Sequence, residues 1–244
     1  MKTKQVWVAL LGVLLLSTAC GKEKKNEGTA VQFKQASYLL SLGEEIPLSQ
    51  LLQSTDINTR ELTVSSSKPS VATIENGRIK AQASGETEVL IAQKGQAAKL
   101  KLGVQDFRKP FDADPLFFRT FVWDFVASPK NVTNNTGRPV IIDFWADWCG
   151  PCKLTVGPYR QLAEEYDGKA ILLKVDLSKK DAEGFAIFDA LYLSGVPELQ
   201  DLLVEKKLIL PSFVMMSGKS NAMKISKGAA VDIPLGNFLK DEFK

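Results

Sequence analysis

The sequence predicts two folded units behind an export signal: a small all-β sandwich followed by an α/β domain. Residues 30–105 hold short alternating runs separated by turn signals at roughly 8–12-residue spacing, which is typical of a sandwich. Residues 106–244 hold a buried-strand pattern that runs directly into a helical pattern. The length of 244 residues fits one or two domains of roughly 100–200 residues each.

The composition narrows the chemistry that the chain can carry. With 45% hydrophobic and 24% charged residues, it is neither disordered throughout nor collagen-like. A net charge of +3 is too small for the basic surface of a nucleic-acid binder, so no nucleic-acid partner is expected. The absence of histidine excludes Ser-His-Asp and Cys-His mechanisms and histidine-ligated metals. Three cysteines are too few for a disulfide scaffold, so a reactive role for them is the main candidate.

Residues 1–19 have the pattern of a secretory signal: a basic start, an apolar run over 6–16 and small residues before Cys20. The apolar run is too short for a transmembrane helix, which needs about 20 residues. The small residues before Cys20 resemble a bacterial lipobox, although Ser17 stands where that motif prefers leucine. The resemblance implies a bacterial lipoprotein, lipidated on Cys20 and anchored in a membrane by its acyl chains. Ordinary cleavage near this point is the alternative.

The segment after Cys20 divides into a tether and the expected sandwich. Residues 20–29 are expected to form a solvated tether, because the charged stretch 22–28 has no apolar side chain. Within 30–105, Asn76-Gly77 lies between two strand-like runs. Both residues tolerate positive φ, so this pair predicts a β-hairpin.

Residues 30–105 also resemble a bacterial immunoglobulin-like group 2 domain over nearly their whole length. The matching segments are 42–44, 64–74, 76–77 and 83–87. The resemblance implies an immunoglobulin-like sandwich that serves as a spacer, an adhesin stalk or a glycan-surface module. A spacer is favoured, because the segment has no clustered aromatic residues to stack on sugars.

The other two cysteines stand at the junction of a strand and a helix. Residues 140–144 form a mostly apolar run of strand formers, as expected for a buried parallel strand, and 153–166 have helical spacing. Cys149 therefore lies at a helix N-terminus, where unpaired N–H groups and the helix dipole stabilise a thiolate. Such a position lowers the pKa of a cysteine below the free value of about 8.5. Cys152 lies one turn along and can close a disulfide with it.

A zinc site and a structural disulfide are the two alternative roles for this Cys-x-x-Cys pair. The pair can supply half of a zinc site, but four ligands are needed and no histidine or further cysteine remains once Cys20 is lipidated. Only an intermolecular site would work, so no metal is expected. A purely structural disulfide is possible in an oxidising compartment. It is less favoured, because a four-residue loop provides little entropic stabilisation.

Residues 143–153, Asp-Phe-Trp-Ala-Asp-Trp-Cys-Gly-Pro-Cys-Lys, resemble the active-site signature of thioredoxin. Further matching segments are 164–169, 173–176, 210–219, 227–229 and 235–243. The resemblance implies a thioredoxin fold over 106–244, so the expected fold class is an α/β thioredoxin fold preceded by a small all-β immunoglobulin-like sandwich. It also implies thiol–disulfide exchange with no cofactor besides the redox-active Cys149–Cys152 pair.

The resemblance also assigns roles in the exchange reaction. Cys149 matches the attacking cysteine and Cys152 the resolving one. Asp143 matches a buried acid beneath them, and a carboxyl on a buried strand can relay a proton to or from Cys152. Lys174 matches the lysine that approaches this acid. Trp148 matches the aromatic residue that shields the thiols.

Substrate contacts are implied as well. Gly150 and Pro151 complete the motif in the form that the reducing members carry. Pro211 matches the cis-proline opposite the disulfide, which leaves the backbone of Leu210 to pair with an extended substrate. Pro197 is the competing candidate for that proline. Pro211 is preferred, because a strand-like run follows it whereas 198–205 looks helical.

Two departures from a minimal thioredoxin, and one segment dense in aromatic residues, stand out in the sequence. Gly157-Pro158 predicts a kink in the helix after Cys152. Residues 181–208 form an insertion, helical over 181–193, that is either decorative or shapes partner choice. The dense aromatic residues of 106–138 are expected to fill the core beside the first strand and helix, with a docking surface as the alternative.

The expected function is a membrane-anchored thiol–disulfide oxidoreductase that reduces disulfides of exported proteins, facing the periplasm or the cell surface. No NADPH or flavin site is recognisable, so a membrane-embedded protein is expected to donate electrons. One alternative is a surface binding or adhesion lipoprotein that uses the thioredoxin domain as a platform. Another is a dithiol oxidase or isomerase, since about 30 mV of reduction potential corresponds to roughly 1.4 kcal/mol.

Overall fold

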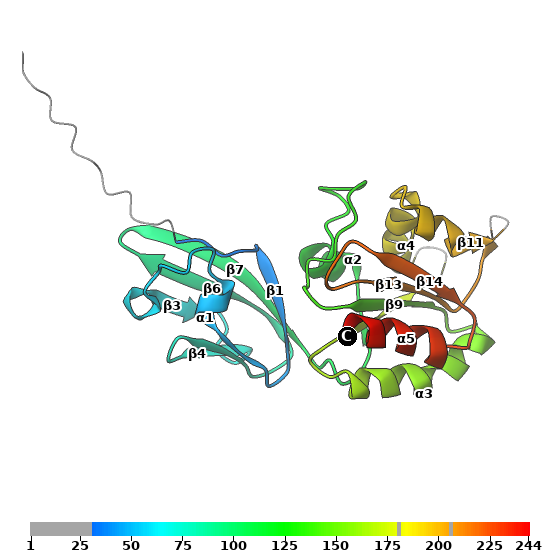
Figure 1. The fold of residues 1–244 in the computed structure, drawn as a ribbon, viewed down its shortest axis with the longest axis horizontal. Helices are drawn as coiled ribbons and strands as arrows, with labels where there is room; N and C mark the ends of the chain where they lie inside the picture. The colour runs from blue at the N-terminus through cyan, green and yellow to red at the C-terminus, as the bar shows by residue number, and fades with distance from the viewer. Residues whose placement is uncertain (1–30, 180–181, 205–206) are drawn as a thin grey trace, which may run out of the picture.

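The computed structural model describes residues 31–179, 182–204 and 207–244 (Figure 1). The signal and the whole of the tether, including Cys20, lie outside the described residues. Among the helices that are described, none is long and apolar enough to cross a membrane.

The first domain is built from two sheets that share one core, and all of their strand pairs are antiparallel except β1 with β7. One sheet has the order β1-β7-β6-β3 and the other β2-β5-β4. Their inward residues, such as Leu40, Ile79 and Leu102, form a single buried cluster. The elements are β1 Ser37–Ser41, β2 Glu45–Pro47, α1 Leu48–Leu51, η1 Thr59–Glu61, β3 Thr63–Ser66, β4 Ala72–Glu75, β5 Arg78–Ala81, β6 Gly85–Gln93 and β7 Gln96–Gln105.

The predicted hairpin is confirmed. Strands β4 and β5 pair antiparallel with Glu75 opposite Arg78. The two loop residues, Asn76 and Gly77, have φ of 50° and 71°. These values belong to the left-handed region that a tight two-residue turn requires.

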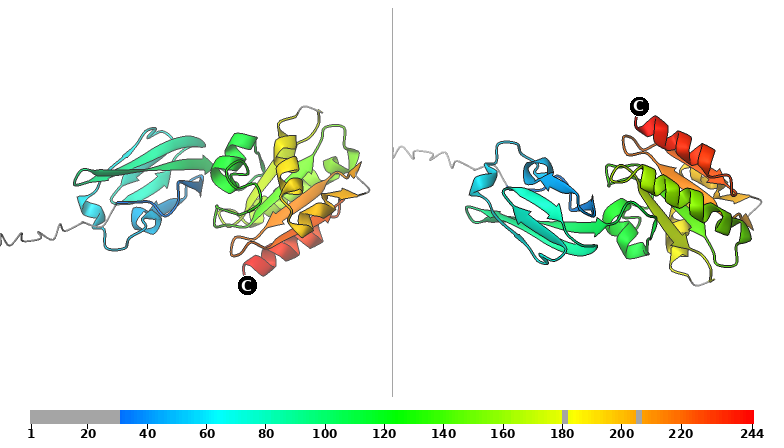
Figure 2. Two further views of the ribbon diagram at one scale, coloured as in Figure 1. Left: turned by 90° about the horizontal axis from the view of Figure 1, so that it is seen from above. Right: turned by 90° about the horizontal axis from the view of Figure 1, so that it is seen from below.

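The second domain is a five-stranded mixed sheet with helices on both faces. The strand order is β14-β13-β9-β10-β8, with β9 parallel to β10 and antiparallel to β13. Helices α3 and α5 cover one face and α4 the other (Figure 2). The elements are β8 Phe111–Asp112, α2 Pro115–Phe117, the π-helical turn η2 Phe118–Val122, β9 Val140–Trp145, α3 Gly150–Glu165, β10 Ile171–Asp176, α4 Gly184–Leu193, η3 Pro197–Leu202, β11 Leu203–Val204, β12 Lys207–Leu208, β13 Ser212–Met216, β14 Met223–Lys227 and α5 Asp232–Glu242.

The aromatic residues of 106–138 belong to the core, as predicted. Phe107, Phe118, Phe121 and Trp123 are almost wholly buried in one cluster with the residues of β9 and β10. The indole N–H of Trp123 donates to the carbonyl of Ser128, 3.1 Å away. Core packing therefore accounts for the density of aromatic residues in this segment.

The insertion differs from the prediction in its second half. Helix α4 is present, but the described part of the predicted helix, 198–204, is a 3₁₀ turn followed by a short strand. Leu199 and Leu202 are buried at three-residue spacing, which matches the tighter 3₁₀ turn η3. The chain then extends into β11, which pairs antiparallel with β12. Tertiary burial of the two leucines overrides the helical propensity of this stretch.

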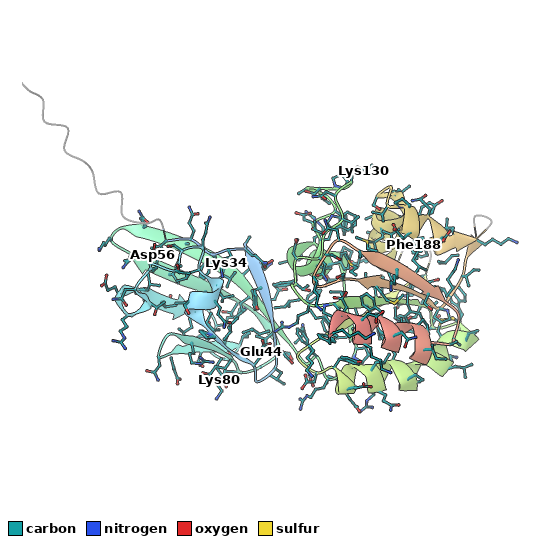
Figure 3. The ribbon with its side chains drawn as sticks, in the orientation of Figure 1. Lys34, Glu44, Asp56, Lys80, Lys130 and Phe188 are labelled. Atoms are coloured by element: carbon teal, nitrogen blue, oxygen red, sulfur yellow. A yellow bond between two sulfur atoms is a disulfide. The ribbon has the colours of Figure 1, made fainter. Side chains whose placement is uncertain are left out.

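The two domains contact each other through β1 of the first and through η2 and Arg138, just before β9, of the second. Leu39 packs into the core cluster of the second domain, whereas its neighbour Leu40 packs into the first. The Arg138 guanidinium donates to the carbonyl of Leu39 at 2.7 Å and pairs with Glu44. Figure 3 shows Glu44 on the side of the first domain that faces the second. Gly103 on β7 fits this contact, because a Cβ there would lie 2.7 Å from the Leu39 side chain.

Candidate active site

Cys149 and Cys152 form a disulfide where β9 leads into α3. Their Cα atoms are 5.3 Å apart. Cys149 is the N-cap of α3, and the backbone N–H of Cys152 donates to its Sγ at 3.2 Å. The sulfur that would become the thiolate therefore already accepts a hydrogen bond from the first turn of the helix. Each cysteine is 4% exposed, so the pair is nearly closed off from solvent.

The covering of the disulfide comes from two directions. Ala146 is buried with the two cysteines, and Trp145 and Leu210 pack against them. The Leu210–Pro211 peptide is cis, as expected, and β13 begins immediately after it. The rival Pro197 instead starts the 3₁₀ turn η3. Among the described residues, no backbone hydrogen bond is made by Leu210, so its polar groups are available to an extended chain.

The exposed residues of the motif lie around the disulfide. Trp148 is 66% exposed, and its indole N–H donates to the carbonyl of Ser178 at 2.9 Å. Gly150 and Pro151 lie exposed in the first turn of α3. No atom would lie within 4 Å of a Cβ at Gly150, so this face of the motif is open. Pro158 lies inside α3, which runs on past it to Glu165, so the kink expected near Gly157-Pro158 stays a prediction.

Asp143 lies on β9 beneath the cysteines and is 4% exposed. Its Oδ1 has no hydrogen-bond partner in the described part of the chain. Asp143 and Cys152 line the same small cavity of about 70 Å³. Burial raises the pKa of Asp143 to about 7, although the nearby Lys174 acts in the opposite direction. A carboxyl group with this pKa can hold or release a proton near neutral pH.

Lys174 lies beside Asp143 in the sheet and lines the same small cavity, but the ion pair of its ammonium group is made with Asp112. The two residues are register partners on β10 and β9. The Nζ of Lys174 lies 4.1 Å from the centre of the Trp145 ring and 3.8 Å from Oδ1 of Asp112. No ion pair joins Lys174 to Asp143 among the described residues. Lys174 is therefore the neighbour of Asp143 on the adjacent strand, as the resemblance implies, but it forms no ion pair with Asp143 in the described residues.

Two residues near the site were not predicted from the sequence. The Tyr159 hydroxyl lies 2.8 Å from the carbonyl of Ile141 and 2.9 Å from that of Leu173, so it bridges β9 and β10 beneath α3. The Trp145 ring is the platform for the lysine. Alternation along β9 puts Trp145 on the same face as Asp143, and that period of two could have indicated it.

In the described part of the chain, no group of three or more cysteine, aspartate or glutamate side chains lies close enough together to hold a metal ion.

Comparison with known proteins gives a consistent result for the second domain. The thioredoxin family model matches residues 127–207. A thioredoxin of Borreliella burgdorferi is 33% identical over 106 residues, which cover 43% of this chain and 74% of that protein. Thioredoxin 1 of Chlorobaculum tepidum is 52% identical over 61 residues, 25% of this chain and 56% of that protein.

The crystal structure of the short form of thioredoxin f from spinach chloroplast is 24% identical, covering 56% of this chain and 95% of that one, with a TM-score of 0.36. The chain spans just over half the length of two of its curated relatives, at 56% and 54%. The match to the Borreliella burgdorferi protein is long enough to decide the family. Through its C-terminal domain, with a thioredoxin fold around Cys149 and Cys152, this chain belongs to the thioredoxin family.

Proposed function

We propose that the chain is a thiol–disulfide oxidoreductase that reduces disulfides in exported proteins while anchored to a membrane. The observation that carries the proposal is the Cys149–Cys152 disulfide at the N-terminus of α3, with the Cys152 N–H donating to Cys149 Sγ. That hydrogen bond and the helix dipole stabilise negative charge on Cys149 once the pair is reduced.

The reaction follows from this geometry in two displacements. The Cys149 thiolate attacks one sulfur of a substrate disulfide, forms a mixed disulfide and releases the other substrate sulfur as a thiolate. Cys152 then loses its proton to the Asp143 carboxylate and attacks Cys149 Sγ, so that the second substrate thiolate leaves. Two electrons pass to the substrate, and the Cys149–Cys152 disulfide is formed again. The two substrate thiolates take up two protons, one that Asp143 returns and one from the solvent.

Asp143 fits the role of proton acceptor because of where its carboxyl group lies. It shares a cavity with Cys152, and its pKa of about 7 lets it cycle between charged and neutral forms near neutral pH. In the described part of the chain Oδ1 accepts no hydrogen bond, so it can take a proton without breaking one. A group that must both take and return a proton works best with a pKa close to the ambient pH.

Substrate binding is assigned to the rim of the disulfide. The backbone of Leu210 would pair with an extended substrate segment, in the manner of strand addition. Trp148, Gly150 and Pro151 offer an exposed surface beside it. In this oxidised state the disulfide is almost wholly buried, and the Leu210 side chain packs against it. A substrate that binds at the rim would displace that side chain.

The remainder of the chain fits a tethered enzyme. Lipidation of Cys20 would hold it in the membrane, and a membrane-embedded dithiol protein would return electrons to the Cys149–Cys152 pair. We assign the first domain as an immunoglobulin-like spacer. Its division into one sheet of four strands and one of three is also that of constant-type immunoglobulin domains. Strand β1 is the edge strand of the four-stranded sheet and pairs parallel with β7.

A trapping experiment tests the proposal. The variant Cys152→Ala, reduced and mixed with a disulfide-bonded protein such as insulin, should accumulate a mixed disulfide through Cys149. The variant Cys149→Ala is the matched control and should trap nothing. With dithiothreitol as donor, the unaltered protein should reduce insulin catalytically. Failure of both trapping and turnover would favour the surface-binding role, whereas a potential well above that of the periplasmic donor would favour an oxidase or isomerase.

A further inference from the structure

Three charged residues lie side by side across neighbouring strands of the second domain. Asp112 on β8 is the register partner of Lys174 on β10, and Lys174 is the register partner of Asp143 on β9. Register partners have their side chains on the same face of a sheet. One lysine therefore stands between two carboxyl groups, one at the exposed edge and one in the interior.

The ammonium group of Lys174 interacts with Asp112, the exposed one of the two carboxylates. Its Nζ is 3.8 Å from Oδ1 of Asp112 and lies over the Trp145 ring. Asp112 is largely solvent-exposed, with 79% of its side chain accessible, whereas 29% of the Lys174 side chain is. The Oδ1 of buried Asp143 remains without a partner among the described residues. The Lys174 ammonium group thus interacts with Asp112 and the Trp145 ring, and it makes no ion pair with Asp143 among the described residues.

We propose that Asp112 is a positioning residue for thiol exchange, which competes with Asp143 for the Lys174 ammonium group and so keeps the Asp143 carboxyl group able to carry a proton. This inference rests on the proposed function of the disulfide. Trp145 supports it, because a cation over an indole ring is attracted to the ring face. Asp112 lies on a two-residue edge strand outside the Cys-Gly-Pro-Cys motif.

The direction of the effect follows from the charges around Asp143. Loss of the Asp112 charge would free Lys174 to move toward Asp143, stabilise the carboxylate and lower the Asp143 pKa. The other charged or titratable groups that line the two cavities along this row, or lie beneath it, are Asp147, Lys153, Tyr159, Asp114, Asp176, Lys179 and Glu183. They are unchanged by a substitution at Asp112.

The test measures the Asp143 pKa directly, in the oxidised protein, by NMR titration of its carboxyl carbon. In Asp112→Asn we expect the pKa of Asp143 to fall by about 0.5, as appropriate for an exposed ion pair. Glu183→Gln removes an equal charge from the same side of the domain and should leave the Asp143 pKa unchanged. Glu183 lines the outer cavity but is paired with no lysine among the described residues.

The same substitution in a variant without Lys174 separates competition for the lysine from a direct electrostatic effect of the Asp112 charge on Asp143. In Lys174→Met, the further change Asp112→Asn should not move the Asp143 pKa. An equal fall with and without Lys174, or no fall at all, would overturn the proposal. Trp145→Phe weakens the ring's hold on the cation and should move the Asp143 pKa in the same direction as Asp112→Asn. These titrations do not require catalysis, so a protein that fails to reduce insulin would refute the proposed function and leave this test intact.

Discussion

The substitution Asp143→Asn should make the second domain more stable at neutral and alkaline pH. Burial raises the pKa of Asp143 from 3.8 to about 7. The native state therefore binds more protons than the unfolded state between these two values, and stability contributed by this group is lost as the pH rises through that window. At about 1.4 kcal/mol per pKa unit, the full loss above pH 7 amounts to about 4 kcal/mol.

Asparagine is close to aspartic acid in shape and carries no charge at any pH, so the variant escapes this loss. The difference in unfolding free energy between variant and unaltered protein should grow by about 4 kcal/mol between about pH 4 and pH 8.5. Below the unfolded pKa both proteins carry a neutral side chain, and the two should then differ little in their response to pH.

Urea unfolding of the oxidised protein, followed by tryptophan fluorescence, measures this difference. The sequence has four tryptophans, and Trp123, Trp145 and Trp148 all lie in the second domain, so fluorescence reports on the right unit. Asp241→Asn is the control, because Asp241 is exposed and the Lys244 side chain that donates to it lowers its pKa. Stability curves for Asp143→Asn and the unaltered protein that stay parallel from acid to alkaline pH would show that the carboxyl group is not desolvated as described.

Three further predictions concern packing and reactivity. Gly184→Ala should lower the melting temperature, because its Cβ would lie 2.3 Å from a backbone oxygen of β10, whereas Gly157→Ala has open space and should stabilise α3 by about 0.5–1 kcal/mol. Leu39→Ala should cost about 2–5 kcal/mol in thermal or urea unfolding, while Leu90→Ala, at a residue 37% exposed, should cost much less. In the reduced protein, Cys149 should react with iodoacetamide faster than free cysteine at neutral pH, and an equal or slower rate would contradict the stabilised thiolate.

The parts of the site that lie within one stretch of chain could be predicted from the sequence. A strand that runs straight into a helix puts the residue between them at the helix N-terminus, so the position of Cys149 follows from residues 140–166 alone. The choice of Pro211 over Pro197 also depended on local pattern, namely the strand that follows it. The aromatic core was predictable because bulky apolar residues bury wherever the chain allows.

The position of Lys174 could not be predicted, because it depends on how three strands align laterally. Asp112 reaches the lysine only through a two-residue edge strand, which has no periodicity that a sequence pattern could detect. The contact between the two domains could not be predicted from the sequence for a similar reason. In β1, Leu39 and Leu40 read as one apolar pair, yet alternation along the strand sends them into different cores.

The cost of burying Asp143 is itself an argument for its function. Buried polar atoms in native proteins are nearly always hydrogen-bonded, yet Asp143 Oδ1 has no partner among the described residues. A neutral side chain of similar size would fill the same place without the loss of stability above pH 7. The lysine that could compensate the charge is register-adjacent but lies over Trp145 instead. An arrangement that lowers stability and leaves a carboxyl group unpaired beside Cys152 is what proton transfer to and from that sulfur requires, because a fully satisfied carboxylate would not take the proton.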